Sequence, residues 1–357
     1  MNRSVIKQLI VPVLIVIFIA VVFHVQQNGI SSMKQLFQGK VSEKPGREIN
    51  VTYDIWIPYW DQEKVLDSLE YSKNKLSTVL PVWYKIDPEG SLLKIEPVED
   101  RNIRNLLLGT GVKLIPTIQN DFDPVRVSEF LKNEEKMDTF INELVSLATE
   151  EAYDGWDINF EQVYEEDREL FVQFIKKTSG RFKEEGLILS VTVHAQTGTV
   201  ADWSGAKGHD WEGIGNTVDV VRIMVYDFHN KGSVAGPITP VDNLRDVLSY
   251  ANKVLPREKV VVGLPLYGYD WVGDRGVPID FEKTGEIVKE YKVQPIRDRK
   301  SGELNFNYTQ NDQKHTVWYQ DAVSVAEKMK VAKEYGYNRF TFWRLGGEDK
   351  EIWKKLQ

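Results

Sequence analysis

From residue 49 onward, short β-rich segments alternate with segments whose apolar residues recur every three or four positions. The clearest helical segment places Met137, Phe140, Ile141 and Leu144 on one face. Sustained alternation of this kind predicts a parallel sheet whose strands are joined by helical crossovers. We expect strands at Val51–Ile57, Thr78–Tyr84, Val112–Ile118, Gly155–Glu161, Ile188–His194, Val218–Tyr226, Lys259–Leu266 and Arg339–Trp343.

A set of eight such strands predicts an α/β fold of the TIM (β/α)8 barrel type. The competing fold is an open doubly wound sheet, but no glycine-rich phosphate-binding loop follows the first strand. The 357 residues accommodate one barrel of about 250 residues with additions. The segment between the seventh and eighth strands is too long for a plain loop and contains turn signals such as Lys300-Ser301-Gly302, so we expect a small β-rich insertion at about residues 268–320.

The N-terminus carries an export signal. Arg3 and Lys7 precede an uncharged apolar run from Leu9 to Phe23, the charge order that keeps the start of a chain inside the cell while the rest is exported. No small residues suited to cleavage follow, so residues 1–25 are expected to form a transmembrane anchor, with a cleaved signal sequence as the alternative. Residues 26–48 are polar and predict a linker, which leaves residues 49–357 as the barrel domain. We therefore expect an extracytoplasmic protein anchored to the cell membrane, or a secreted one if cleavage occurs.

Composition excludes several classes of function. The net charge of −8, with no basic cluster, argues against nucleic-acid binding. The chain has no Cys and only five His, none paired at metal-ligand spacing, so we expect no disulfide, thiol catalysis, metal or other cofactor. The sequence does not indicate an oligomeric state.

One expected strand, Gly155–Glu161, carries polar side chains at alternate positions. Asp157, Asn159 and Glu161 share one face of it, because successive side chains on a strand point to opposite faces. Helices cover the outside of a barrel, so these three groups must point inward, at a cost of several kcal/mol unless they are paired or reach solvent at the barrel mouth. That cost suggests a functional site. The other face, expected to pack on the helices, carries Trp156, Ile158 and Phe160.

Glu161 is the candidate proton donor. Crowding by Asp157 and Asn159 and partial burial are expected to raise its pKa, as a general acid requires near neutral pH. Arg222, on the inner face of the sixth strand, is expected to pair with a barrel carboxylate. His194 and His229 could reach the barrel mouth, although a lone histidine is more often structural.

Four motifs in the expected order carry a resemblance to a known family. Asp154-Gly-Trp-Asp157-Ile-Asn159-Phe-Glu161 resembles the Asp-x-x-Asp-x-Asp-x-Glu strand of family 18 glycoside hydrolases, the chitinase-like enzymes. Three further segments resemble the ends of that family's sixth, seventh and eighth strands. These segments are Met224-Val-Tyr226-Asp227, Gly263–Trp271 and Phe342–Gly346. The run Tyr226-Asp227-Phe228-His229, followed by Gly236-Pro237-Ile238, is particularly similar to the bacterial branch of the family that includes spore-cortex glucosaminidases.

The resemblance implies substrate-assisted hydrolysis of a polysaccharide containing N-acetylglucosamine, such as peptidoglycan or a chitin-like polymer. It implies Glu161 as the acid and later the base, and Asn159 at the position that orients the substrate acetamide. The remaining implied roles are Tyr226 on the acetamide, Asp227 on a sugar hydroxyl, Trp343 as a stacking platform, Met224 lining the site, and Asp157 with Asp154 as a buried carboxylate relay.

Asn159 departs from the family pattern, which has Asp two residues before the acid. An amide can orient the acetamide but cannot balance positive charge on an oxazolinium-like intermediate. The alternative function is therefore a carbohydrate-binding module with weak or no catalysis. Family 85 endo-β-N-acetylglucosaminidases resemble the same strand, with Asp-Gly-Trp before an Asn-x-Glu pair, and that likeness favours activity with Asn159 in place.

Overall fold

The computed structural model describes residues 51–96, 100–200 and 202–356. The predicted export segment at residues 1–25 and the predicted linker at residues 26–48 lie outside these residues. Within the described ranges, every helix is too short or too polar to span a bilayer.

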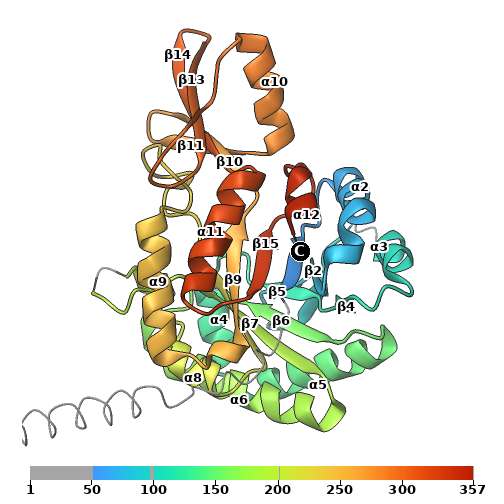
Figure 1. The fold of residues 1–357 in the computed structure, drawn as a ribbon. Helices are drawn as coiled ribbons and strands as arrows, with labels where there is room; N and C mark the ends of the chain where they lie inside the picture. The colour runs from blue at the N-terminus through green and yellow to red at the C-terminus, as the bar shows by residue number, and fades with distance from the viewer. Residues whose placement is uncertain (1–50, 97–99, 201, 357) are drawn as a thin grey trace, which may run out of the picture. The chain divides into compact units, whose positions relative to one another are not determined.

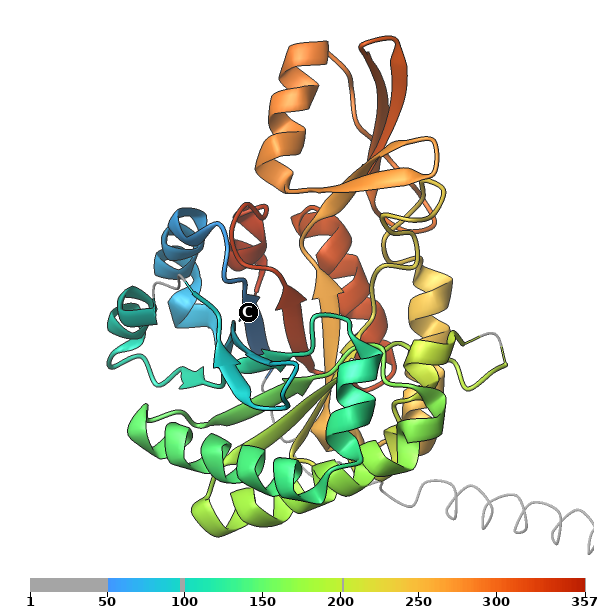
Figure 2. The same ribbon diagram turned by 180° about the vertical axis from the view of Figure 1, so that it is seen from behind.

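Eight parallel strands close into a ring in the described part of the chain (Figures 1 and 2). Each strand pairs with the next, and β1 pairs with both β2 and β15, so the ring has no free edge. The TIM-barrel prediction is confirmed. The strands are β1 (Thr52–Ile57), β2 (Thr78–Ile86), β5 (Thr117–Gln119), β6 (Gly155–Asn159), β7 (Ile188–His194), β8 (Val220–Met224), β9 (Val260–Pro265) and β15 (Arg339–Trp343).

Helices surround this ring (Figure 2). The predicted apolar face of α5 is buried, and the side chain of Asn133 caps the helix by accepting a hydrogen bond from the Lys136 N–H. The helix α6 ends at Gly186, whose φ of 70° suits a residue without Cβ. The helices are α2 (Gln62–Ser72), α3 (Asp100–Leu107), α4 (Pro124–Leu131), α5 (Glu134–Glu150), α6 (Arg168–Glu185), α7 (Ser204–Lys207), α8 (Trp211–Gly215), α9 (Val241–Val254), α11 (Ala322–Glu334) and α12 (Glu351–Lys355).

The third predicted strand is interrupted. The segment expected as one strand forms β4 (Lys113–Leu114) and β5, separated at Ile115-Pro116. Proline has no N–H to donate to a ladder, but its carbonyl still accepts, here from the Asp157 N–H at 2.9 Å. Both pieces pair with β2, which in turn pairs antiparallel with the short strand β3 (Leu92–Lys94).

An insertion between β9 and β15 forms a separate five-stranded antiparallel sheet (Figure 1). It rises from the carboxyl ends of the barrel strands, because β9 leads directly into β10. A helix, α10 (Phe281–Tyr291), packs Ile287 on this sheet and was not anticipated from the sequence. The strands of the insertion are β10 (Gly268–Val272), β11 (Arg275–Ile279), β12 (Ile296–Arg297), β13 (Leu304–Gln310) and β14 (Gln313–Tyr319).

A buried ion pair fastens the insertion to the barrel. Glu303 and Lys328 are fully buried and 3.2 Å apart. The Glu303 carboxylate also accepts hydrogen bonds from the N–H groups of Ile238 and Thr239, at 2.8 and 2.9 Å. These two residues lie in the loop after β8, so the insertion and that loop are held to each other.

The barrel interior is polar. Arg222 of β8 lies 2.6 Å from Asp54 of β1, and both side chains are almost completely buried. The predicted pairing of Arg222 with a barrel carboxylate is confirmed. Its Nε also donates to Ser190 at 3.0 Å, so the charges inside the ring are paired and hydrogen-bonded, as burial in a medium of low polarity requires.

Candidate active site

Glu161 lies just beyond the carboxyl end of β6, since the strand ends at Asn159 and not at Glu161 as expected. Its backbone is held by the side chain of Asn120, which follows β5. Asn120 Oδ1 accepts from the Glu161 N–H at 2.9 Å, and Nδ2 donates to the Glu161 carbonyl at 2.6 Å. This two-point contact fixes the direction in which the Glu161 side chain leaves the strand.

The apolar face of the same segment packs on the helices, as predicted. Trp156 is fully buried and its Nε1 donates to the Leu144 carbonyl of α5 at 2.9 Å. Phe160 stacks on Phe174 of α6 with ring centroids 6.1 Å apart. Because these side chains set the rotation of the strand, Asp157 and Glu161 are turned toward the barrel axis and its mouth.

Asp157 is completely enclosed in the barrel. Its carboxylate accepts hydrogen bonds from the hydroxyl groups of Thr117, Ser190 and Thr192, at distances from 2.6 to 3.1 Å. The indole N–H of Trp56 lies 3.4 Å away. The carboxylate is thus held beneath the mouth by neutral donors of β1, β5 and β7, and its Oδ1 also lies 3.9 Å from Nε of the cationic Arg222.

The prediction that Asp154 belongs to a buried carboxylate relay is wrong. Asp154 is exposed and precedes β6, at the end of the strand opposite to Glu161. Its Oδ2 accepts from the Leu114 N–H at 2.8 Å, which ties β4 to the start of β6. The residue spacing was consistent with a relay, but three residues along an extended strand span about 10 Å, which carries Asp154 away from the mouth.

The pKa of Glu161 is raised to about 7, mainly by burial and to a smaller extent by the negative charge of Asp227. The hydrogen bond from Asn159 Nδ2 to Oε1, 3.2 Å long, acts in the opposite direction, as does the cationic Lys231. The predicted direction of the shift is confirmed, but Asn159 lowers the pKa where crowding was expected to raise it. A carboxyl group with a pKa near 7 can donate a proton at neutral pH and accept one afterwards.

Glu161 faces a cavity of about 610 Å³ at the barrel mouth. Met224 and Tyr226, which come from β8 and the residues just after it, line the same cavity, and so does Asp227. Burial, together with the nearby carboxylates of Glu161 and Asp227, raises the pKa of Tyr226 well above its ordinary value, so its hydroxyl stays protonated. The tertiary structure therefore brings together four of the residues chosen from the sequence.

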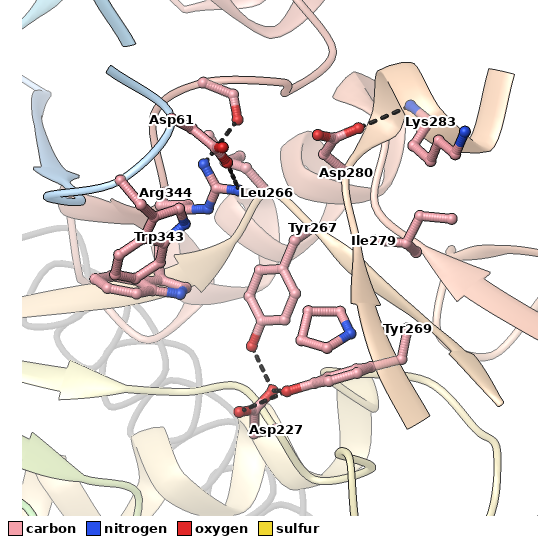
Figure 3. A pocket seen from close by; sticks show the side chains of 13 residues that line it. Asp61, Asp227, Leu266, Tyr267, Tyr269, Ile279, Asp280, Lys283, Trp343 and Arg344 are labelled. Atoms are coloured by element: carbon pink, nitrogen blue, oxygen red, sulfur yellow. Dashed lines mark hydrogen bonds and ion pairs between the residues drawn. The ribbon is translucent and has the colours of Figure 1, made fainter. Parts of the chain in front are cut away.

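Asp227 is bound by two tyrosines of the seventh-strand region, as Figure 3 shows. The hydroxyl groups of Tyr267 and Tyr269 both donate to its carboxylate. Burial nevertheless raises the pKa of Asp227 above its usual value, against the lowering effect of these hydrogen bonds. Its backbone has a φ of 61°, a left-handed conformation that Asp tolerates better than most residues and that turns it toward the mouth.

Trp343 lies at the end of β15, across the barrel mouth from β6 and Glu161. It lines an adjoining cavity of about 410 Å³ with Asp227, Tyr267 and Arg344 (Figure 3). Its ring meets the edges of Trp56 and Trp60, with centroids 6.1 and 6.2 Å away, so the indole plane is fixed. A fixed aromatic plane of this kind offers a surface on which a sugar ring can stack.

The sequence profile of Glycosyl hydrolases family 18 matches residues 55–348. The chain belongs to this family. A relative, the cortical fragment-lytic enzyme of Bacillus anthracis, is 31% identical over 275 residues, which are 73% of this chain and 63% of that protein. The family 18 chain is therefore a glycoside hydrolase of the chitinase-like kind.

Solved structures share the fold of this chain. The spore cortex-lytic enzyme SleL of Bacillus cereus superposes with a TM-score of 0.79 at 24% identity, over 86% of this chain and 73% of that one. A chitinase from Chromobacterium violaceum has the same TM-score at 25% identity, over 86% and 98% of the two chains. The fold of the described residues is thus shared with these solved structures.

The contacts of three residues in this family 18 site, Asn120, Tyr267 and Tyr269, were not predicted from the sequence. Asn120 follows a strand only three residues long, and a lone Asn carries no catalytic signal. Tyr267 and Tyr269 lie within a segment that resembled the family, but nothing in the spacing indicated that both would bind Asp227.

In the described ranges, no group of three or more His, Asp or Glu side chains is arranged to hold a metal ion.

Proposed function

We propose that this family 18 enzyme hydrolyses β-linked glycans containing N-acetylglucosamine by a substrate-assisted mechanism that retains anomeric configuration. The observation that carries the proposal is the position of Glu161, a carboxyl group with a pKa of about 7 that faces the same cavity as Tyr226 and Asp227. A proton donor beside two further polar groups in a cavity of this size is what cleavage of a glycosidic bond requires.

Among the described residues around the Glu161 cavity, no carboxylate is placed to act as the nucleophile, which supports the substrate-assisted route. Asp157 is completely enclosed by hydroxyl donors and cannot reach a sugar, and Asn159 is an amide. Asp227 is held by two tyrosine hydroxyl groups. A retaining enzyme without a carboxylate nucleophile needs one from the substrate, and the 2-acetamido carbonyl oxygen is available for that purpose.

In the first step, Glu161 gives its proton to the glycosidic oxygen as the bond from that oxygen to the anomeric carbon breaks. The acetamido carbonyl oxygen forms a new bond to the anomeric carbon, and the positive charge moves onto the resulting oxazolinium ring. In the second step, the Glu161 carboxylate takes a proton from water, the water oxygen bonds to the anomeric carbon, and the ring opens. Tyr226 is proposed to bind the acetamide, Asp227 a sugar hydroxyl, and Trp343 the sugar face.

An envelope glycan such as peptidoglycan is the proposed substrate, with endo cleavage. The relatives named for cortical fragments or spore cortex support this class of polymer. Asp227 lines three cavities, of about 410, 610 and 700 Å³, and Glu161 lines the one of 610 Å³. Cavities that adjoin the Glu161 cavity offer room for further sugar units, which suits an internal bond of a polymer.

Defined oligosaccharides test this function. We expect release of products with retained configuration from oligomers of N-acetylglucosamine or from peptidoglycan fragments, and none from the same oligomers without the N-acetyl group. Cleavage of the de-acetylated oligomers at an equal rate would contradict the mechanism. Chain-internal products from a long oligomer would support endo action, and exclusive release of terminal units would contradict it.

A membrane tether on the outer face of the cell is also proposed, on the basis of the apolar run from Leu9 to Phe23 behind Arg3 and Lys7. We expect the full chain to sediment with membranes and to be released by detergent but not by salt. Recovery of a shortened protein in the medium would instead indicate a cleaved signal sequence.

A non-catalytic carbohydrate-binding protein is the second candidate, favoured by Asn159. This candidate requires a wild type that binds oligosaccharides without turnover and gains activity in Asn159→Asp. Turnover by the wild type rejects it.

A further inference from the structure

His194, at the end of β7, lies beside the proposed acid. Its Nε2 is 3.6 Å from Glu161 Oε2, and this nitrogen is buried without a hydrogen-bond partner. The other carboxylate oxygen, Oε1, already accepts a hydrogen bond from Asn159 at 3.2 Å. Each oxygen of Glu161 therefore faces one neutral side chain, and a buried ring nitrogen without a partner is costly unless it gains one during function.

The position of His194 is set by a second histidine, His209. The backbone N–H of His194 donates to His209 Nδ1 at 3.2 Å, so His209 must carry its proton on Nε2. That Nε2 lies 2.9 Å from the carbonyl oxygen of Phe160, the residue immediately before Glu161. His209 thus joins the end of β7 to the end of β6, and the two imidazole rings stack with centroids 5.6 Å apart.

Trp203 closes the other side of the His194 ring. The two ring centroids are 4.8 Å apart at an interplanar angle of 75°, an edge contact that leaves little freedom of rotation. Burial lowers the pKa of His194 to about 3, with a smaller contribution from His209. The imidazole is therefore neutral at the pH at which Glu161 titrates.

A neutral donor suits this position. A cationic imidazole at the same place would favour ionised Glu161 and remove the proton that the first step needs. A neutral N–H stabilises the ionised form of Glu161 less than a cationic imidazole does, so Glu161 remains protonated near pH 7. The same N–H still stabilises the negative charge that Glu161 carries after it has given up its proton. The other groups that face Glu161 are Asn159 on β6, Tyr226 and Asp227 after β8, and Lys231 in the loop that follows.

We propose that His194 is a positioning residue for Glu161, whose neutral Nε2–H donates to Oε2 of the carboxylate formed when the proton leaves. Together with Asn159, it holds both oxygens while Glu161 changes from acid to base. This inference rests on the proposed role of Glu161.

Two substitutions distinguish a hydrogen bond from His194 to Glu161 from a role of His194 in packing alone. His194→Gln places an amide nitrogen near the position of Nε2, whereas His194→Asn places it near Nδ1, out of reach of Glu161. We expect His194→Gln to keep kcat/KM within about fivefold of wild type, and His194→Asn to lose about tenfold or more, the worth of one hydrogen bond to a charged group. The alkaline limb of the pH profile should move upward by about half a unit or more in His194→Asn only, because the carboxylate loses a donor.

The matched control is His229→Asn, since His229 uses Nδ1 to contact only the Pro237 carbonyl at 2.8 Å and Asn retains that nitrogen position. Its pH profile should equal that of wild type. A ¹³C titration of the Glu161 carboxyl group measures the same pKa change without turnover, in any variant whose thermal unfolding shows that it is folded.

Equal losses in the Gln and Asn variants with an unmoved alkaline limb would overturn the proposal and leave His194 a packing residue. A limb that moves downward in His194→Asn would also overturn it, because Nε2 of the wild type would then be an acceptor of a hydrogen bond from protonated Glu161 and not a donor to its carboxylate. Failure of the proposed function itself looks different: wild type and Glu161→Gln would both be inactive on every N-acetylated glycan.

Discussion

The Nδ2 atom of Asn159 lies 3.2 Å from Oε1 of Glu161, while Oδ1 of the same amide is buried without a hydrogen-bond partner. The amide thus presents its donor to the acid and keeps an acceptor free. A free acceptor next to the acid can bind the N–H of a substrate acetamide, which is the orienting part of the task that an Asp performs at this position in the family.

Asn159→Asp tests how much of the rate depends on charge at this position. A second carboxylate 3 Å from Glu161 disfavours its ionised form, so the alkaline limb of kcat/KM should move upward by about one pH unit. We expect a wild type that is already active and a change in maximal kcat of less than about tenfold. Activity that exists only in Asn159→Asp would identify the natural protein as a binding module.

Glu161→Gln removes the acid without changing the shape of the site. We expect kcat to fall by about 10²- to 10⁴-fold, the usual contribution of a general acid, with little change in oligosaccharide affinity. Initial rates and isothermal titration calorimetry measure the two quantities separately. Wild-type turnover by this variant would exclude Glu161 as the acid.

The same variant should be more stable than wild type at alkaline pH. The pKa of Glu161 is raised from 4.5 to about 7 in the folded state, so its protonated form is the one that folding favours. The pH-dependent loss of folding free energy that Glu161 causes is absent below about pH 4.5 and grows as the pH rises to 7. Above pH 7 it is constant, on the order of 1–3 kcal/mol. Denaturant unfolding of both proteins at pH 4.5 and pH 8 measures the difference, and a gain that is the same at both values would contradict the assigned pKa.

Asn120→Ala should reduce catalysis more than stability. It removes both hydrogen bonds to the Glu161 backbone, so the acid is less well directed, and we expect kcat to fall by about 10- to 100-fold with KM nearly unchanged. Unfolding free energy should fall by about 1–3 kcal/mol, the cost of leaving buried backbone groups unpaired. Asn133→Ala, which removes a helix cap distant from the site, is the control: it should cost a similar free energy without a loss of kcat.

Glu303→Ala should loosen the insertion. The substitution leaves Lys328 as a buried, uncompensated charge and orphans the N–H groups of Ile238 and Thr239, so we expect a loss of about 3–5 kcal/mol. Glu303→Ala combined with Lys328→Met removes the stranded charge and should recover part of that loss. Thermal unfolding checks both variants; a double variant less stable than the single one would mean that the lone Lys328 is not what costs stability.

The sequence alone predicted the barrel and Glu161 as the candidate acid. Alternation of strand and helix patterns is a local property, so it appears directly in the order of residues, and the spacing of two along a strand placed Asp157, Asn159 and Glu161 on the face opposite Trp156 and Phe160. The motif segments added Tyr226, Asp227 and Trp343 by resemblance.

Only the tertiary structure decided which of these residues meet. Asp154 matched the motif but lies at the far end of its strand, while Asn120 and His194 lie outside the motif segments and yet contact Glu161. Tyr267 lies within a motif segment, but its contact with Asp227 could not be predicted from the spacing. Closure of the ring brings the carboxyl ends of different strands together across dozens of residues, and which side chains then touch depends on register and on where each strand stops. Burial of Glu161 follows from the same assembly, so its raised pKa had a predictable direction, while the opposing contribution of Asn159 became visible only in the folded chain.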